Sequence, residues 1–157
     1  MKAMPNKNLI HITLVICSLG FLSCGRSTSM IDECNAVLER DRAFSTYSQE
    51  HGVAKAFYKF ASGKAVLLRE NSYPIIGNEK IRQLFEKTAL DESILSWKPE
   101  YVDVSASKDM AYTYGFYKYT TPDSTYKGCY VSIWKKDISN TWKYVFDSGT
   151  SGLGKEK

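Results

Sequence analysis

The sequence predicts an α+β domain in which three N-terminal helices pack on one face of a strongly curved, mainly antiparallel sheet. Two observations predict this class. After residue 28, apolar residues first recur at the three- and four-residue spacing of amphipathic helices. The second half instead alternates stretches rich in Tyr, Trp, Val, Ile and Thr with short turn-forming segments. Short connections favour antiparallel neighbours over parallel crossovers, so helices are expected first and a four-stranded meander after them.

Local signals set the predicted boundaries of the helical half. Ser29 and Asp32 stand in capping-box relation at the start of the first helix, and Gly52 ends it. Asn78 is placed to cap the third helix. The predicted segments are helix 29–50, helix 53–61, a short strand at 65–69, an irregular stretch at 73–77 and helix 78–89.

The strand half is divided by segments rich in Asp, Ser, Asn, Pro and Thr, which are typical of turns. The predicted strands are 94–105, 110–120, 126–136 and 141–148. The tail at 150–157 is rich in Gly, Ser and Lys, and we expect it to be loose.

The first 23 residues are interpreted as an export signal. Lys2 and Lys7 precede an apolar run at 9–22, which is shorter than the ~20 residues needed to span a bilayer. The sequence around Cys24, Phe-Leu-Ser-Cys-Gly, resembles the lipobox of bacterial lipoproteins. The resemblance implies lipidation of Cys24, a tether at 24–30, and a bacterial envelope protein that faces the periplasm. Ordinary secretory cleavage, which would release a free periplasmic protein, is the alternative.

Composition excludes several classes of protein. An apolar fraction of 43% is too high for a disordered chain. Removal of the export segment lowers the formal charge from +4 to +2, so no nucleic-acid partner is expected. Cys and His residues lack metal-site spacing, and we expect neither a metal nor another cofactor. Cys34 and Cys129 allow one disulfide at most, and both also suit small apolar positions. His51 has no nucleophile-elbow sequence to accompany it, which argues against a serine hydrolase.

Six stretches, in this order along the chain, resemble the SnoaL-like domains of the nuclear transport factor 2-like superfamily. They are 39–44 (ERDRAF), 73–77 (YPIIG), 95–99 (LSWKP), 110–115 (MAYTYG), 130–136 (YVSIWKK) and 142–149 (WKYVFDSG). The resemblance covers 31–149 and implies a cone-shaped fold with an internal cavity and frequent dimerisation through the sheet. It implies no single activity, because the superfamily includes isomerases, cyclases, dehydratases, ligand binders and assembly modules.

The ketosteroid isomerases of this superfamily use an aspartate near the end of the first strand as the proton-transfer base. The corresponding stretch here, 65–69, reads Ala-Val-Leu-Leu-Arg and contains no carboxylate. Arg69 cannot act as a general base at neutral pH, because the pKa of a guanidinium exceeds about 12. Isomerase chemistry by that route would require another carboxylate.

Two aspartates are candidates for that role. Asp41 lies on the apolar stripe of the first helix, so its carboxylate points toward the core or the cavity. It pairs structurally with Arg69 or a strand hydroxyl, or it serves the cavity as a ligand contact or acid/base group, or it is simply exposed at an edge. Asp147 matches the family motif and is expected to face inward, although the alternation of the last strand equally allows the outward face.

Aromatic residues are concentrated in the strands, which reflects β-propensity and core packing or, alternatively, a pocket wall. The predicted wall residues are Trp97, Tyr114 and Trp134, and the predicted polar contacts are Asp41, Arg69 and Asp147. The leading hypothesis is a lipid-anchored domain that binds a small, partly apolar molecule. The alternatives are a cyclase, isomerase or dehydratase that uses a cavity aspartate, and an envelope interaction module. We also expect a homodimer.

Overall fold

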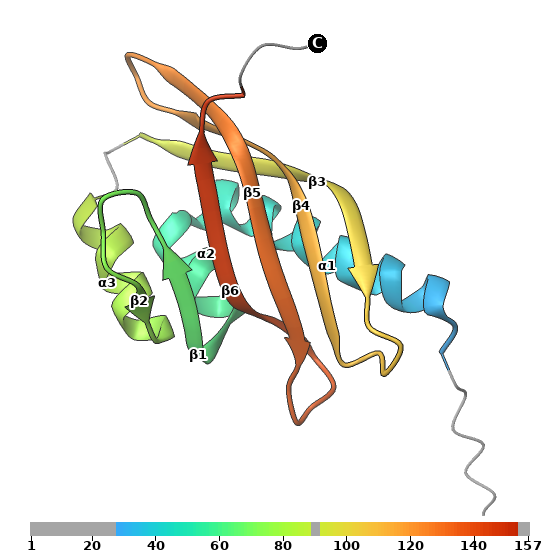
Figure 1. Ribbon diagram of the computed structural model, residues 1–157. Helices are drawn as coiled ribbons and strands as arrows, with labels where there is room; N and C mark the ends of the chain where they lie inside the picture. Colours follow the sequence, from blue (N-terminus) through green and yellow to red (C-terminus); the bar gives the residue numbers. More distant parts are fainter. Residues whose placement is uncertain (1–27, 89–91, 154–157) are drawn as a thin grey trace, which may run out of the picture.

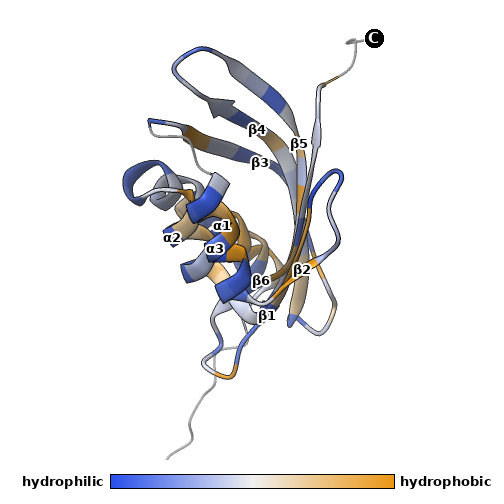
Figure 2. Ribbon diagram, turned by 90° about the vertical axis from the view of Figure 1, so that its left-hand side faces the viewer, coloured by the Kyte–Doolittle hydropathy of each residue, from blue (hydrophilic) through white to orange (hydrophobic). Residues whose placement is uncertain are grey.

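Three helices lie against the concave face of a six-stranded sheet in the computed structural model, which describes residues 28–88 and 92–153 (Figure 1). Viewed from the side, the two layers are distinct, and the far end of the sheet bends over the helices (Figure 2). The elements are α1 (Met30–His51), α2 (Val53–Phe60), β1 (Ala61–Leu68), β2 (Ile75–Ile76), α3 (Asn78–Thr88), β3 (Ile94–Val104), β4 (Met110–Thr120), β5 (Thr125–Lys136) and β6 (Trp142–Ser151). The predicted α+β class, with helices on a curved and mainly antiparallel sheet, is confirmed, and the sheet does not close into a barrel.

The strand order is β2-β1-β6-β5-β4-β3, and every neighbouring pair is antiparallel except β1 and β6. The last four strands form the predicted meander. Because β1 precedes the meander but pairs with its final strand, the first and last strands of the sheet in sequence lie side by side. None of the helices in the described residues has the length and hydrophobicity to cross a membrane.

The capping predictions for α1 hold in detail. The Ser29 hydroxyl accepts from the backbone of Asp32 at 3.0 Å, and the Asp32 carboxylate accepts from the backbone of Ser29 at 3.1 Å. Gly52 adopts φ +90° at the end of the helix, a conformation that costs glycine little. The sequence therefore fixes both ends of the longest helix through local hydrogen bonds and backbone freedom.

Three boundaries differ from the predictions. β1 begins at Ala61, the predicted end of the second helix and four residues before the predicted start of the strand, because Ala61 already pairs with Tyr144. The segment expected to be irregular contains β2, since Ile75 and Ile76 pair with β1. The last strand continues into the tail that was expected to be loose, because Ser151 pairs with Gly128. In each case a partner distant in sequence extends or creates a strand.

The sheet bends where strands approach closely. A side chain at Gly115 would place its Cβ 2.0 Å from the carbonyl oxygen of Lys98. The register between β3 and β4 shifts in the same place, between Pro99 and Tyr101. A glycine beside an irregular register is a common device for curving a strand pair. The bend carries those ends of β3, β4 and β5 that lie near the β4–β5 hairpin over the helical layer (Figure 2).

The core is an aromatic cluster between the layers. Phe44 of α1 lies at its centre and packs against Phe57, Phe60, Trp97, Trp134 and Tyr144, with ring centroids 4.6–6.3 Å apart. Such rings bury large apolar areas in close contact. This cluster closes one end of the space between helices and sheet.

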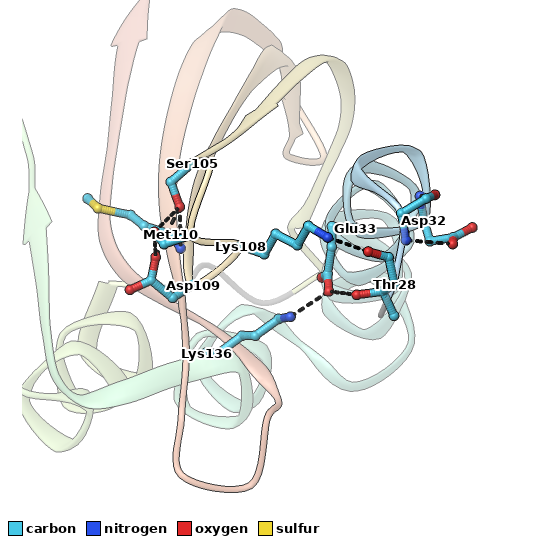
Figure 3. A network of polar contacts seen from close by, with 10 residues as sticks. Thr28, Asp32, Glu33, Ser105, Lys108, Asp109, Met110 and Lys136 are labelled. Atoms are coloured by element: carbon cyan, nitrogen blue, oxygen red, sulfur yellow. Dashed lines mark hydrogen bonds and ion pairs between the residues drawn. The ribbon is translucent and has the colours of Figure 1, made fainter. Parts of the chain in front are cut away.

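The start of α1 is held to the turn end of the sheet by a polar network (Figure 3). The nearly buried carboxylate of Glu33 accepts from Lys136 at 2.7 Å and from the Thr28 hydroxyl at 2.6 Å. Lys108, in the turn between β3 and β4, donates to the backbone carbonyl of Thr28. The chain thus enters the fold beside the β3–β4 and β5–β6 turns.

Candidate functional site

A cavity of about 410 Å³ lies between the helices and the curved part of the sheet. Its apolar and aromatic lining residues are Val53, Phe57, Phe85, Leu95, Trp97, Tyr117, Tyr119, Tyr126 and Tyr130. Its other lining residues are Arg69, Thr88, Ser93, Asp147, Gly149 and Ser151. Thr88, Tyr126 and Ser151 are exposed, which places the mouth at the end of the sheet that carries the β4–β5 hairpin.

Asp147 is a buried carboxylate in the cavity wall. It lies on β6 with 6% of its surface exposed and accepts a 2.7 Å hydrogen bond from the Ser132 hydroxyl. Among the described residues, Ser132 is its single hydrogen-bond donor. Burial raises the pKa of this carboxyl, while the charge of Arg69 and the bond from Ser132 act in the opposite direction. Asp147 can therefore accept a hydrogen bond or exchange a proton with a molecule in the cavity.

Asp41 lies behind the wall, not in it. Its side chain is fully buried, and its two oxygens accept from the Trp97 indole at 2.7 Å and from the Tyr130 hydroxyl at 2.8 Å. Burial raises the pKa of Asp41 to about 6, against the opposing effect of hydrogen bonds from Thr113, Trp97 and Tyr130. Of the alternatives considered for Asp41, the structure shows pairing with strand hydroxyls and an indole, and Arg69 takes no part in this pairing.

Arg69 follows the last residue of β1 and supplies a cation to the cavity. The centre of its guanidinium lies 5.3 Å from the Phe85 ring and 5.8 Å from the Phe57 ring, within the range of cation–π attraction. Within the described residues it makes no ion pair shorter than 4.0 Å. Gly149 of β6 is its neighbour, since a Cβ there would lie 3.7 Å from Nη1, an ordinary contact distance.

Of the predicted site residues, Arg69, Trp97 and Asp147 line the cavity, whereas Tyr114 and Trp134, the two other predicted wall residues, lie elsewhere. Tyr114 is 46% exposed on the opposite face of the sheet, where it stacks on Tyr101. Thr113 and Gly115 are the inward residues of β4, so the alternation of the strand turns Tyr114 outward. Trp134 faces inward but is fully buried in the core, and its indole donates to Thr113 at 2.9 Å.

Tyr130 lines the cavity but was not among the predicted site residues, although the sequence contains a signal for its inward position. Tyr130, Ser132 and Trp134 alternate along β5 and share one face, so the inward placement of Trp134 also implies that of Tyr130. The contributions of Phe57 and Phe85 depend on how α2 and α3 pack and have no comparable sequence signal. No group of three His, Cys, Asp or Glu side chains suited to a metal ion occurs among the described residues.

Comparison with solved structures identifies the architecture. A ketosteroid isomerase-like protein from Erwinia carotovora atroseptica has a TM-score of 0.64 at 11% identity, over 78% of this chain and 98% of that chain. A protein from Novosphingobium aromaticivorans, described as Ntf2-like with a cystatin-like fold, has a TM-score of 0.65 at 13% identity, over 80% and 85% of the two chains. This chain has the nuclear transport factor 2-like fold.

Other proteins that share the nuclear transport factor 2-like fold differ in name. A scytalone dehydratase-like protein, also from Novosphingobium aromaticivorans, has a TM-score of 0.64 at 10% identity, over 78% of this chain and 86% of that one. No family model and no curated protein matches the sequence. At these identities the comparisons establish the fold alone, and function must be argued from the site.

Proposed function

We propose that the domain binds a small, partly apolar molecule in the cavity. The observation that carries this proposal is the combination of an aromatic wall with a cation and a buried carboxylate, Arg69 and Asp147, at the same cavity. The volume of about 410 Å³ falls within the ~300–1,000 Å³ typical of small-molecule sites. A plain core would fill this space with side chains, since protein interiors are close-packed.

Native mass spectrometry of the chain carrying Cys24→Ser, exported in a bacterial host and purified gently, tests this proposal. We expect a reproducible additional mass in the protein. Leu95→Trp, which fills the cavity from its wall, should remove that mass without unfolding the domain. The same additional mass in both proteins would contradict a binding role for this cavity. So would the lack of any additional mass in either protein after incubation with apolar aromatic probes.

A second candidate function is an enzyme in which Asp147 transfers a proton. The position of Asp147 in the cavity wall, with a raised pKa and one hydrogen bond, favours it over Asp41 for this role. Asp147→Asn should abolish turnover of the bound molecule while the molecule still binds. Asp103→Asn, on an exposed part of β3, is the matched control and should leave turnover unchanged.

We propose that the protein is exported and anchored through Cys24. The support is the lipobox-like sequence alone, since residues 1–27 lie outside the described part of the structure. Cys24→Ser should move the protein from the membrane fraction to the soluble periplasmic fraction. Cys17→Ser, within the proposed signal, should not. Retention of both variants in the membrane would contradict lipidation of Cys24.

We also propose that the domain forms a homodimer through the outer face of the sheet. Four aromatic side chains of β3 and β4 are 39–49% exposed on that face: Tyr101, Tyr112, Tyr114 and Phe116. An aromatic patch of this kind on a soluble domain is typical of an interaction surface. Sedimentation equilibrium should give a dimer mass, and Tyr114→Ser together with Phe116→Ser should give a monomer. A strictly monomeric wild-type protein would contradict the dimer and the interaction-module alternative.

A further inference from the structure

Two residues of the cavity wall, Tyr130 and Trp97, have polar hydrogens that are already committed to a partner inside the protein. Tyr130 and Trp97 both line the cavity, yet the hydroxyl of the first and the indole of the second donate backward to Asp41. The Tyr130 oxygen can therefore accept from a bound molecule but not donate to it, and the Trp97 indole has no hydrogen to give. Asp41 therefore takes up the hydrogens that Tyr130 and Trp97 could otherwise donate to a ligand, although Asp41 does not line the cavity.

The nearby Asp147 also acts as a hydrogen-bond acceptor. Ser132 and Asp147 are register partners on β5 and β6, and the Ser132 hydrogen is used in the bond to one carboxylate oxygen. Tyr130 lies opposite Gly149, two residues farther along β6, so Tyr130 and Asp147 are close neighbours on adjacent strands of the wall. An ionised carboxylate accepts only. With Asp147 ionised, Tyr130 and Asp147 therefore form an acceptor region in the wall.

Arg69 is the charged donor of the lining, because a guanidinium only donates. It lies near Gly149, just beyond the acceptor region, and its positive charge acts on Asp147. An ammonium group would satisfy the acceptors but would be repelled by Arg69. A carbonyl or ether oxygen would face lone pairs at Tyr130 and Asp147. A neutral hydroxyl satisfies the acceptors, and an acidic group satisfies Arg69.

We propose that the ligand is a hydroxylated aromatic or alicyclic acid, which directs its hydroxyl to Tyr130 and Asp147 and its acidic group to Arg69. This inference rests on the proposed binding function and names the chemical class that the cavity selects. Discrimination by the hydroxyl should be strong, because methylation removes the donor and leaves buried acceptors unpaired.

The test compares matched probes on one protein, the full chain carrying Cys24→Ser, at pH 8 so that Asp41 is ionised. The probes are 6-hydroxy-2-naphthoate, its methyl ether 6-methoxy-2-naphthoate, 2-naphthol, and the uncharged reporter N-phenyl-1-naphthylamine. We expect the hydroxy acid to bind at least tenfold more tightly than the methyl ether by isothermal titration calorimetry. This comparison uses the unaltered cavity and does not depend on the folding of any variant.

Variants then test which residues cause the preference for a hydroxyl and the preference for an acidic group. Tyr130→Phe and Asp147→Asn should each reduce the ratio between hydroxy acid and methyl ether toward one. Arg69→Gln should weaken the hydroxy acid at least tenfold while 2-naphthol binds as before. Retained binding of the reporter shows that each variant keeps its cavity.

The outcomes separate the two proposals. If the reporter binds but the hydroxy acid and its methyl ether bind equally, the donor preference is overturned and the binding function stands. If Arg69→Gln weakens neither acid, the assignment of the acidic group to Arg69 is overturned. If no probe, including the reporter, binds, the proposed binding function fails, and the inference about ligand class fails with it.

Discussion

The hydroxyl of Tyr130 on β5 donates a 2.8 Å hydrogen bond to the fully buried carboxylate of Asp41 on α1, and this bond joins a cavity wall to a charge behind it. The helix and the sheet are thereby tied together at the cavity by a charge-assisted contact. Such contacts are stronger than those between neutral groups. The first two predictions follow from the two partners of this bond.

Loss of the Tyr130 hydroxyl should destabilise the domain. Tyr130→Phe leaves one oxygen of Asp41 without its donor, and an unsatisfied buried acceptor costs about 1–3 kcal/mol. Urea unfolding at pH 8 measures the free energy of unfolding. Tyr126→Phe is the control, since Tyr126 lines the same cavity but is more than half exposed. Equal stability of the two variants would show that the bond to Asp41 contributes little.

Ionisation of Asp41 should lower stability as the pH rises. Burial raises the pKa of Asp41 from 3.8 to about 6 in the folded protein, so the folded state holds its proton more tightly than the unfolded state does. The favourable contribution is complete below pH 3.8 and is lost as the pH rises through about 6. Asp41→Asn removes this dependence, so its free energy of unfolding relative to wild type should improve by about 2 kcal/mol between pH 4 and pH 7.

The measurement is urea unfolding of both proteins at pH 4, 5, 6 and 7. Asp147 also titrates with a raised pKa, and its charge contributes to the shift of Asp41, so the difference between the proteins reports Asp41 together with this coupling. A constant difference across this range would mean that Asp41 has no shifted pKa in the folded state. Unfolding of the variant at every pH would show that the amide cannot replace the carboxylate as a partner of Trp97 and Tyr130.

Arg69 should control the protonation of Asp147. Its positive charge lowers the pKa of this carboxyl against the larger effect of burial, so Arg69→Gln should raise that pKa further. Carboxyl-carbon NMR of protein labelled at aspartate follows the titration directly. Arg82→Gln, on the exposed face of α3, should leave the Asp147 titration unchanged. An unchanged pKa in Arg69→Gln would place the cation too far from the carboxylate to act on it.

The ion pair at the start of α1 should contribute to stability more than its exposed neighbours do. Lys136→Met removes the 2.7 Å partner of Glu33 and leaves a nearly buried carboxylate with the Thr28 hydroxyl (Figure 3). We expect a loss of about 2 kcal/mol in the free energy of unfolding, because a buried charge without its partner is costly. Lys135→Met, at the adjacent exposed position, should change it by less than about 0.5 kcal/mol. Similar losses would mean that the pair is fully hydrated.

The sequence predicted those parts of the fold that local interactions determine. The ends of α1 follow from Ser29, Asp32 and Gly52, all of which act within a few residues along the chain. Strand β2 and the extension of β6 are not determined by local interactions, because each forms by pairing with a strand elsewhere in the sequence. Pairing of this kind leaves little trace in composition or alternation.

The candidate site was predictable to a similar extent. Alternation along a strand groups residues by face but does not say which face is covered, so Asp147 and Tyr114 were equally plausible cavity residues. The partners of Asp41 are 56 and 89 residues away in sequence. The helical position of Asp41 indicates that it is buried, whereas only the packed structure shows that it lies behind Trp97 and Tyr130.

The entry point of the chain at Thr28 has a consequence for how the protein would exchange its ligand. Thr28 lies at the β3–β4 turn end of the sheet, whereas the cavity opens at the β4–β5 hairpin end. Thr28 is four positions after Cys24 in the chain, a span of at most about 14 Å. With an acyl anchor on Cys24, the closed end of the cone would rest near the lipid headgroups and its mouth would point into the aqueous compartment. Molecules would then enter from solution and not by lateral extraction from the bilayer, which suits water-soluble metabolites better than lipids.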